Sequence, residues 1–340
     1  MSRAYKEAFV DNTIIRVDRL RKTFKVSKRP RGFLGHVANL FFPMYETKTA
    51  VSGVSFEIKK GESVGLIGAN GAGKSTAMKI LSGILYPDSG SIEVAGFVPY
   101  RQRREYVANI GAVFGQKSQL SWDLPVIDSF DLLKHIYRVP DETYHSNLAC
   151  FTELLDLSSF IHQPVRQLSL GQRMRADITA ALLHSPQIVF FDEPTIGLDV
   201  VVKERIREFV CRLNRERGVT ILFTTHDMQD IERTCKRLII IDQGAKLYDG
   251  TVDGIMDKYS RERKLVVEFT DECPIRARPD VTLEDLGGCK KAFLYDPGKV
   301  STKDLIAEIT AAHDVRDITV ERAGIESIVR RIYEGTIALS

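Results

Sequence analysis

The segment Gly68–Thr76 has the residue types and spacing that bind the phosphates of a nucleotide. Its glycines let successive backbone N–H groups point at one anion, and a helix that follows adds the positive end of its dipole. Lys74 could then reach the β- and γ-phosphates, and Ser75 could bind Mg²⁺. The residues predicted to contact the nucleotide are Gly68, Asn70, Gly71, Ala72, Gly73, Lys74, Ser75 and Thr76.

Two acidic residues, Asp192 and Glu193, directly follow the apolar run Ile188–Phe191. A run without polar residues is typical of a strand that is buried on both faces. Acids at the carboxyl end of such a strand lie beside the phosphate loop. Asp192 could therefore bind Mg²⁺ through water, and Glu193 could act as the general base for an attacking water.

Two further polar residues follow predicted strands. The buried strand predicted over Val219–Thr225 ends at His226, which is the only one of the seven histidines in such a place. We expect it to sense the γ-phosphate. Gln116 follows the strand-like run Asn109–Phe114, so its amide should face the ligand edge of the sheet.

A third segment could also meet a phosphate group. Gln167–Arg173 introduces a helix predicted over Met174–His184, with Ser169 or Gly171 near its N-terminal cap. Farther along, a turn that ends at Asp199 precedes another predicted helix.

These residues need a folded core to position them. The apolar run Ser63–Ile67 predicts a strand before the glycine loop, and an amphipathic helix should follow the loop. The alternating runs at residues 14–18 and 54–58 should form two paired strands. The pattern turns helical after Leu124, which predicts a helical subdomain inserted at about residues 117–168.

An unusual basic and apolar segment lies between the first two predicted strands, within residues 25–44. Its apolar positions 33, 34, 37, 40 and 41 have helical spacing, and Lys25, Lys28, Arg29 and Arg31 precede them. One interpretation is a short helix that packs on its own domain. The alternative is an amphipathic element that lies at a membrane surface or on a membrane partner.

The composition of the 340 residues is that of a soluble globular protein, with 44% hydrophobic and 27% charged residues. The longest apolar runs have strand length, so we expect no membrane-spanning segment, and no secretory signal is evident. Five scattered cysteines without a C-x-x-C pair predict free thiols and no zinc. The net charge of +3 hides a basic N-terminal end.

With these motifs in this order over residues 14–250, the chain resembles the nucleotide-binding subunit of an ATP-binding cassette (ABC) transporter. The resemblance implies an α/β P-loop NTPase fold with a mixed sheet, an antiparallel β subdomain at the N-terminus and the helical insertion. It assigns the motifs as Walker A at residues 68–76, the glutamine loop at Gln116, the signature at Leu168–Gln172, the end of Walker B at Asp192 and Glu193, the aspartate loop at Asp199 and the histidine switch at His226.

The same resemblance implies further roles. Ser169, Gly171, Gln172 and Asp199 would contact the nucleotide of the opposite subunit in a dimer, most simply a homodimer, and Gln116 would join Ser75 and Asp192 around Mg²⁺. Tyr45 would stack on adenine, although a tyrosine packed in the core is the alternative. Leu170 stands where the family signature usually has glycine. We expect altered packing there and retained hydrolysis of ATP to ADP and phosphate.

Beyond the cassette predicted over residues 1–255, residues 260–340 should form a small α+β accessory domain with an interaction or dimerisation role. The resemblance implies a peripheral ATPase on the cytoplasmic face of the membrane that powers export through separate permease subunits. The permease should dock at the helical subdomain, and no nucleic acid partner is expected. The alternatives are the ATPase of an importer and a non-transport ATPase of the same superfamily. A GTPase or small-molecule kinase would leave the signature and His226 without a purpose.

Overall fold

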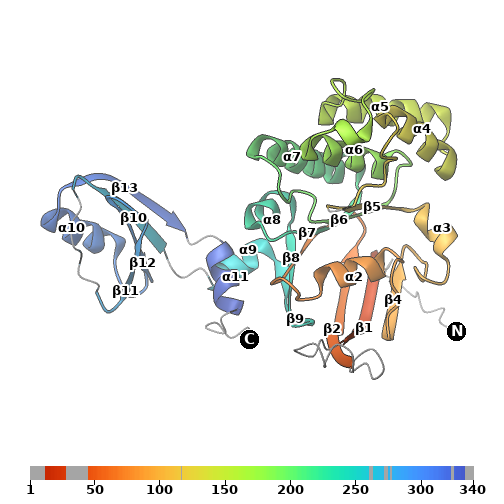
Figure 1. The fold of residues 1–340 in the computed structure, drawn as a ribbon. Coiled ribbons are helices and arrows are strands. Elements are labelled where there is room, and N and C mark those ends of the chain that lie inside the picture. The colour runs from red at the N-terminus through yellow and green to blue at the C-terminus, as the bar shows by residue number, and fades with distance from the viewer. Residues whose placement is uncertain are drawn as a thin grey trace, which may run out of the picture. The chain divides into compact units, whose positions relative to one another are not determined.

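The computed structural model describes residues 12–27, 45–115, 117–259, 263–271, 275, 278–322 and 325–333. The chain divides into two compact units, with the division between Asp249 and Gly250 (Figure 1). The predicted cassette boundary at residue 255 is therefore too late. Helix α9, Val252–Tyr259, groups with the second unit because its contacts are with α11, Ile325–Tyr333.

A six-stranded sheet with the order β5-β6-β7-β3-β8-β9 forms the centre of the first unit (Figure 1). The first five strands run parallel to their neighbours, which brings their carboxyl ends to one edge. Every residue of β3, β6 and β7 is buried, as their apolar sequences predict. The strands are β3 Ser63–Ile67, β5 Ile110–Phe114, β6 Ile188–Asp192, β7 Thr220–Thr224, β8 Arg237–Asp242 and β9 Ala245–Thr251.

A second, antiparallel sheet has the order β2-β1-β4, with β1 at Thr13–Ser27, β2 at Tyr45–Lys59 and β4 at Ser89–Val94. The two short strands predicted near the N-terminus do pair, since Arg16 lies opposite Glu57. Both strands are 15 residues long, however, and their pairing continues to Ser27 and Tyr45. Tyr45 is therefore the first residue of β2 and does not belong to a loop before it.

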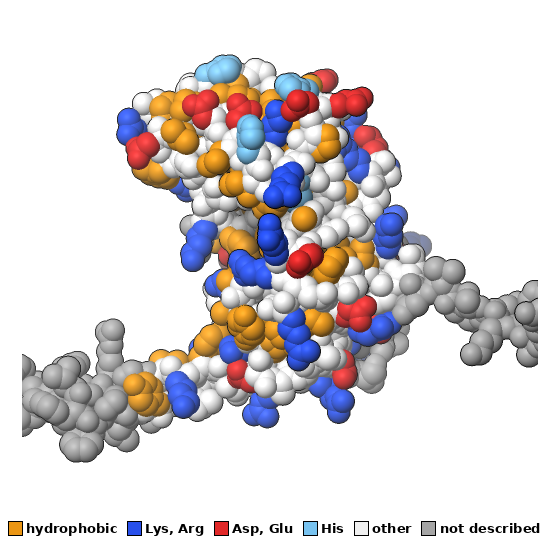
Figure 2. Space-filling view, turned by 90° about the vertical axis from the view of Figure 1, so that its right-hand side faces the viewer, with side chains coloured by type: hydrophobic (Ala, Val, Ile, Leu, Met, Phe, Trp, Pro, Cys, Tyr) orange, Lys and Arg blue, Asp and Glu red, His pale blue; other side chains and the backbone are white. Residues whose placement is uncertain are grey.

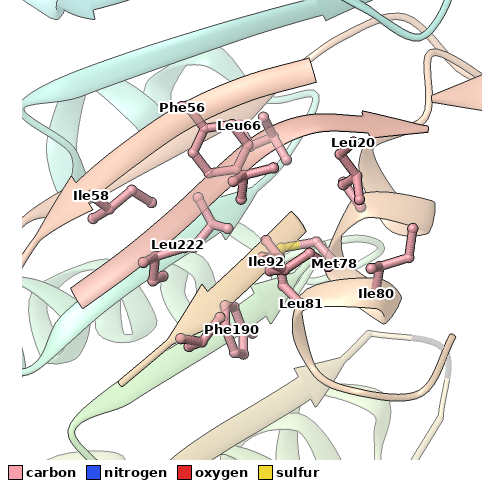
Figure 3. Close-up of a cluster of buried hydrophobic side chains, with 14 of the residues drawn as sticks. Leu20, Phe56, Ile58, Leu66, Met78, Ile80, Leu81, Ile92, Phe190 and Leu222 are labelled. Carbon is pink, nitrogen blue, oxygen red and sulfur yellow. The ribbon is translucent and has the colours of Figure 1, made fainter. Parts of the chain in front are cut away.

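One hydrophobic core joins both sheets to helix α2, Lys74–Leu81. Leu20, Phe56 and Ile92 come from the antiparallel sheet, and Leu66, Phe190 and Leu222 come from the central sheet. Figure 3 shows these side chains gathered with Met78 and Leu81 of α2. The buried apolar face of α2 fixes the helix that follows the glycine loop against both sheets, which holds the loop in place.

The inserted helices lie beyond the β5 side of the sheet in Figure 1. They are α4 Val126–Tyr137, α5 Asp141–Leu155, the short 3-10 helix η1 Val165–Gln167 and α6 Leu170–Leu182. Helix α6 begins four residues before the predicted start because Ser169 caps it. The described part of the unit also contains three more helices, α3 Arg103–Val107, α7 Val200–Arg217 and α8 Met228–Thr234. None of the helices within the described ranges combines the length and apolar character that crossing a membrane requires.

The second unit is α+β, as predicted. Its antiparallel sheet has the order β11-β12-β10-β13 and buries an apolar cluster with helix α10, Thr302–Ala312. The strands include β10 Arg263–Phe269, β12 Lys290–Tyr295 and β13 Val315–Arg322. Strand β11, Val281–Asp285, was not predicted. Together the two units confirm the predicted fold class.

Candidate nucleotide site

A pocket of about 380 Å³ opens over the glycine loop of the first unit. The residues that line it come from the loop itself, from the paired ends of β1 and β2, and from the residue after β6. They are Phe24, Val26, Lys48, Ala50, Asn70, Gly71, Ala72, Gly73, Lys74, Ser75, Thr76 and Glu193. The structure thus brings most of the residues predicted to contact the nucleotide into one concave site.

Close backbone approach requires glycine at two positions of the loop, Gly68 and Gly73. A Cβ atom at Gly73 would collide with the carbonyl oxygen of Ala50, and the φ of 108° at Gly73 also disfavours any other residue. The loop then passes directly into α2. Backbone N–H groups at this turn and the positive end of the α2 dipole suit an anion.

Lys74 is buried at the base of the loop, and its ammonium group folds back onto the backbone. Its Nζ donates to the carbonyl oxygens of Gly68 at 2.7 Å and Ala69 at 3.3 Å. Burial lowers the pKa of Lys74, while the nearby carboxylates of Glu193 and Asp192 act in the opposite direction. A phosphate group that enters the pocket would offer this cation a charged partner.

Asp192 is the last residue of β6 and lies behind the glycine loop. One of its carboxylate oxygens accepts hydrogen bonds from two hydroxyl groups. Thr224 Oγ1 donates to Asp192 Oδ1 at 2.6 Å, and Ser75 Oγ donates to the same oxygen at 3.2 Å. Burial raises the pKa of Asp192. A hydroxyl and a carboxylate oxygen that converge beside a phosphate loop are the hard donors that Mg²⁺ prefers, so these residues fit the ion.

Glu193 and His226 lie together at the edge of the pocket. His226 Nδ1 is 3.7 Å from Glu193 Oε1, and the Glu193 side chain is only 20% exposed. The backbone of Glu193 has a φ of 54°, which is unusual for a residue with a side chain. A carboxylate and an imidazole at this place can accept a proton from water and contact a terminal phosphate.

The backbone before Gln116 packs against the end of β6, although Gln116 itself lies outside the described residues. The backbone N–H of Gly115 donates to the carbonyl oxygen of Asp192 at 2.8 Å. A Cβ atom at Gly115 would collide with the carbonyl oxygen of Glu193. The loop that carries Gln116 therefore begins in contact with both acids.

The sequence analysis missed two wall residues, Phe24 and Val26. They lie on one face of β1 and are 37% and 49% exposed, while Lys48, which is paired with Phe24, lines the pocket from β2. Tyr45 is not among the described residues that line the pocket, and it is 61% exposed at the far end of the ribbon. The signal that could have found Phe24 is the alternation of apolar residues at positions 24 and 26, which extends the first strand.

The signature residues lie apart from this pocket, at the N-terminus of α6. Ser169 and Gln172 form a capping box: Ser169 N donates to Gln172 Oε1 at 2.9 Å, and Gln172 N donates to Ser169 Oγ at 3.2 Å. Asp199 likewise caps α7 and accepts from Val202 N at 2.9 Å. None of these residues, nor Gly171, lines the pocket of its own subunit.

Leu170 packs against the turn that leads to Asp199. A Cβ atom at Gly197 would lie 3.2 Å from Leu170 Cδ2, and one at Gly171 would lie 3.2 Å from a methyl group of Val202. The leucine therefore fills space beside the aspartate loop and leaves Ser169 free to cap α6. Leu170 thus makes a contact between the signature and the aspartate loop.

A glycine loop, two acids and a histidine at the carboxyl edge of a parallel sheet, with a helical insertion and a capped signature helix, define a nucleotide-hydrolysing cassette. A family model described as ABC transporter matches residues 51–196. The linearmycin resistance ATP-binding protein LnrL of Bacillus subtilis is 33% identical over 293 residues, which cover 84% of this chain and 93% of the relative. The chain therefore belongs to the ABC transporter family and is an ATP-hydrolysing subunit.

Other relatives and solved structures agree with this assignment. The Nod factor export ATP-binding protein I of Burkholderia pseudomallei is 30% identical over 280 residues, which cover 81% of each chain. The solved dimeric structure of the ATP-binding cassette MJ0796, in a post-hydrolysis state with bound ADP and Pi, is 26% identical with a TM-score of 0.58. The match covers 70% of this chain and 98% of that cassette.

Proposed function

We propose that this chain hydrolyses ATP at the pocket over the glycine loop and thereby drives export through separate permease subunits. The observation that carries the chemical part is the place of Glu193, which lines the phosphate pocket and lies 3.7 Å from His226. Glu193 acts as the general base, His226 senses the γ-phosphate, and Lys74 binds the β- and γ-phosphates.

Mg²⁺ belongs to this proposal because the donors present fit it. Ser75 and Asp192 would hold the ion, the latter through water, and Gln116 would join them from the adjoining loop. When bound, the ion would neutralise charge on the β- and γ-phosphates. The two hydroxyl groups on Asp192 Oδ1 hold that carboxylate in one orientation.

Phe24 replaces Tyr45 in the proposal as the ring that stacks on adenine. Phe24 lines the same pocket as the glycine loop and is 37% exposed, whereas Tyr45 lies three residue pairs farther along the β1–β2 ribbon. The base would then lie against Phe24 and Val26, with the phosphates on the loop.

The signature completes the site of a second copy. Ser169, Gly171, Gln172 and Asp199 lie outside the pocket of their own subunit but sit at or beside the N-termini of two helices, α6 and α7. Such termini suit a γ-phosphate presented by an opposite subunit. The dimeric structures of the similar cassette MJ0796 support this arrangement.

The helical part of the cassette offers the docking surface for the permease. Several large apolar side chains are exposed there: Trp122, Leu124, Leu132 and Ile136. Figure 2 shows hydrophobic side chains on the surface of this part, at the top of that view. Exposed apolar side chains in one region are typical of a protein interface. This surface continues from the loop after Gln116. Binding of the permease there would therefore change the position of residues that contact the nucleotide.

Export, rather than import, is supported by the names of similar proteins that this chain matches beyond the cassette. The linearmycin resistance relative is matched over 93% of its length, which includes part of the second unit here. The proposed location of the chain follows from this role: the permease would hold it at the cytoplasmic face of the membrane. The alternatives are an importer ATPase and a non-transport ATPase.

Co-purification with a polytopic membrane protein from the native host tests the transport part. We expect the complex to contain a polytopic permease and no extracytoplasmic binding protein, and Ile136→Asp to lower its recovery without weakening ATP binding. An extracytoplasmic binding protein in the complex would contradict export and indicate import. Stoichiometric recovery of the chain without a membrane protein would contradict transport altogether.

A further inference from the structure

A buried polar network lies behind the pocket, with Asp230 of α8 at its centre. Asp230 is 0% exposed. Its Oδ2 accepts two hydrogen bonds, from Thr195 Oγ1 at 2.5 Å and from Thr225 Oγ1 at 2.8 Å. Its Oδ1 accepts from Arg207 Nε of α7 at 2.7 Å. One carboxylate therefore joins the residue before His226 to α7 and to the segment after Glu193.

The two threonines are neighbours of the residues proposed to act on ATP. Thr195 follows Glu193 by two positions, and Thr225 directly precedes His226. The hydroxyl of Thr225 also accepts from the backbone N–H of Asp227 at 3.0 Å, so it fixes the chain on both sides of His226. The backbone of Glu193 has a positive φ, a conformation that persists only where neighbouring contacts over-determine it.

Arg207 gives the network its positive charge and links it to the aspartate loop. The Arg207 side chain is 6% exposed and also lies 3.3 Å from Asp227 Oδ2 and 3.2 Å from Glu204 Oε2. Lys203 Nζ adds a 2.8 Å ion pair to Asp227. Both cations belong to α7, the helix that Asp199 caps at its N-terminus. Buried charges with complete partners are stable, whereas removal of one partner is costly.

We infer that Asp230 is a positioning residue that holds Glu193 and His226 in register through the hydroxyl groups of Thr195 and Thr225. The inference rests on the proposed roles of Glu193 and His226. Asp230 lies behind the pocket and does not line it. Its carboxylate is the common acceptor that orients both hydroxyls, and Arg207 donates to its other oxygen. A small displacement of a catalytic group costs rate far more than it costs binding.

Matched pairs at the two threonines separate this role from general stability. Thr195→Val and Thr225→Val keep the shape but remove the hydroxyl, whereas Thr195→Ser and Thr225→Ser keep it. We expect each valine variant to lower kcat about 10-fold or more, with KM for ATP and the ATP dissociation constant within about 2-fold of wild type. The serine variants should keep at least about half of the wild-type kcat.

Hydrogen exchange gives a second measurement that does not depend on turnover. Thr225→Val removes the acceptor of the Asp227 N–H, so amide exchange around residues 225–228 should accelerate by about 10-fold in that variant and stay near wild type in Thr225→Ser. In a His226→Ala background, Thr225→Val should lower kcat by less than about 2-fold further, because its effect runs through His226.

Three outcomes would overturn the inference: wild-type kcat in both valine variants, serine variants that fall as far as the valine variants, or losses that appear in KM and ATP affinity and not in kcat. Glu193→Gln, measured in parallel, separates the proposed function from the positioning role of Asp230. If Glu193→Gln keeps its turnover, the proposed function fails; if it loses turnover while the valine variants keep theirs, only the role of Asp230 fails.

Discussion

At the scale of single residues, the account depends most on the carboxylate of Glu193. We predict that Glu193→Gln lowers ATP turnover by 10²- to 10⁴-fold, because the amide keeps the shape but cannot accept a proton from water. ATP affinity, measured by calorimetry, should stay within about 3-fold. Glu142→Gln on the exposed start of α5 is the control and should keep the full rate. More than about a tenth of the wild-type rate in Glu193→Gln would place the base elsewhere.

The base-binding wall gives a second test of single residues. Phe24→Ala should weaken ATP binding by about 10-fold, because stacking of a base on an aromatic ring contributes about 1–3 kcal/mol. Tyr45→Ala is the matched control and should change the ATP dissociation constant by less than about 2-fold. The opposite pattern, with loss of affinity only in Tyr45→Ala, would restore the original assignment of the stacking ring.

The proposed exchange of Tyr45 for Phe24 rests on a feature of the fold that the sequence does not give, unlike the placement of the loop and the acids. The glycine loop, Asp192 and Glu193 could be placed because apolar strands end directly at them, and the parallel sheet brings those ends together. The stacking ring depends on how far β1 and β2 run beyond the predicted strands, and on a pairing with several register shifts. Local patterns carry no information about such a register.

At the scale of elements, Asp177 joins α6 to the segment after Gln116. Asp177 Oδ1 accepts from Ser118 Oγ at 2.8 Å and from Gln119 N at 3.0 Å. Burial raises the pKa of Asp177 from 3.8 to about 6, although both hydrogen bonds oppose the rise. The folded chain therefore binds a proton at Asp177 at pH values where the unfolded chain has lost it.

This raised pKa predicts the direction of a pH effect. Between about pH 4 and pH 6 the native state binds more protons at Asp177 than the unfolded state, so the contribution of this group to stability falls as pH rises, by at most about 3 kcal/mol. Asp177→Asn should remove that part of the pH dependence. Denaturant unfolding followed by the fluorescence of Trp122, the only tryptophan, measures it. Parallel stability curves for the two proteins would contradict the buried, proton-binding carboxylate.

The segment between β1 and β2 is a second element with a specific prediction. Residues 28–44, which contain most of the basic and apolar insert, lie outside the described residues, but the flanking strands pair up to Ser27 and Tyr45. A short Gly-Ser link in place of residues 28–44 should therefore leave ATP affinity of the isolated subunit unchanged. We expect it to lower recovery of the complex with the permease, because basic residues near a membrane contribute about 1 kcal/mol each. Full recovery and full transport would favour a local helix that covers its own domain.

Elements that tertiary packing creates were the ones that the sequence did not predict. Strand β11 has a mixed pattern with only Val281 buried, and it is a strand because it pairs along β12. Helix α9 is short and follows β9 directly, so no loop signal separates it from the cassette. In contrast, the buried residues of α11 recur at helical spacing, which is a pattern that the sequence alone can show.

At the scale of the whole molecule, the residues proposed to contact nucleotide lie at two separate places of one chain. The glycine loop and Glu193 line the pocket, while Ser169 and Asp199 cap helices and do not line it. The proposal that a second copy brings its signature to the first copy's phosphates gives both places one role. Because Leu170 contacts the turn at Gly197, the signature and the aspartate loop would move together as one unit toward the opposite subunit.

Light scattering of the Glu193→Gln chain with and without ATP and Mg²⁺ tests this central claim most directly. The account predicts twice the monomer mass with ATP and the monomer mass without it, because unhydrolysed nucleotide joins Lys74 of one copy to Ser169 of the other. Glu193→Gln combined with Ser169→Arg should bind ATP and stay monomeric, since a long side chain would block the capped end of α6. A Glu193→Gln chain that is saturated with ATP and still monomeric at tens of micromolar would contradict a site completed by a second copy.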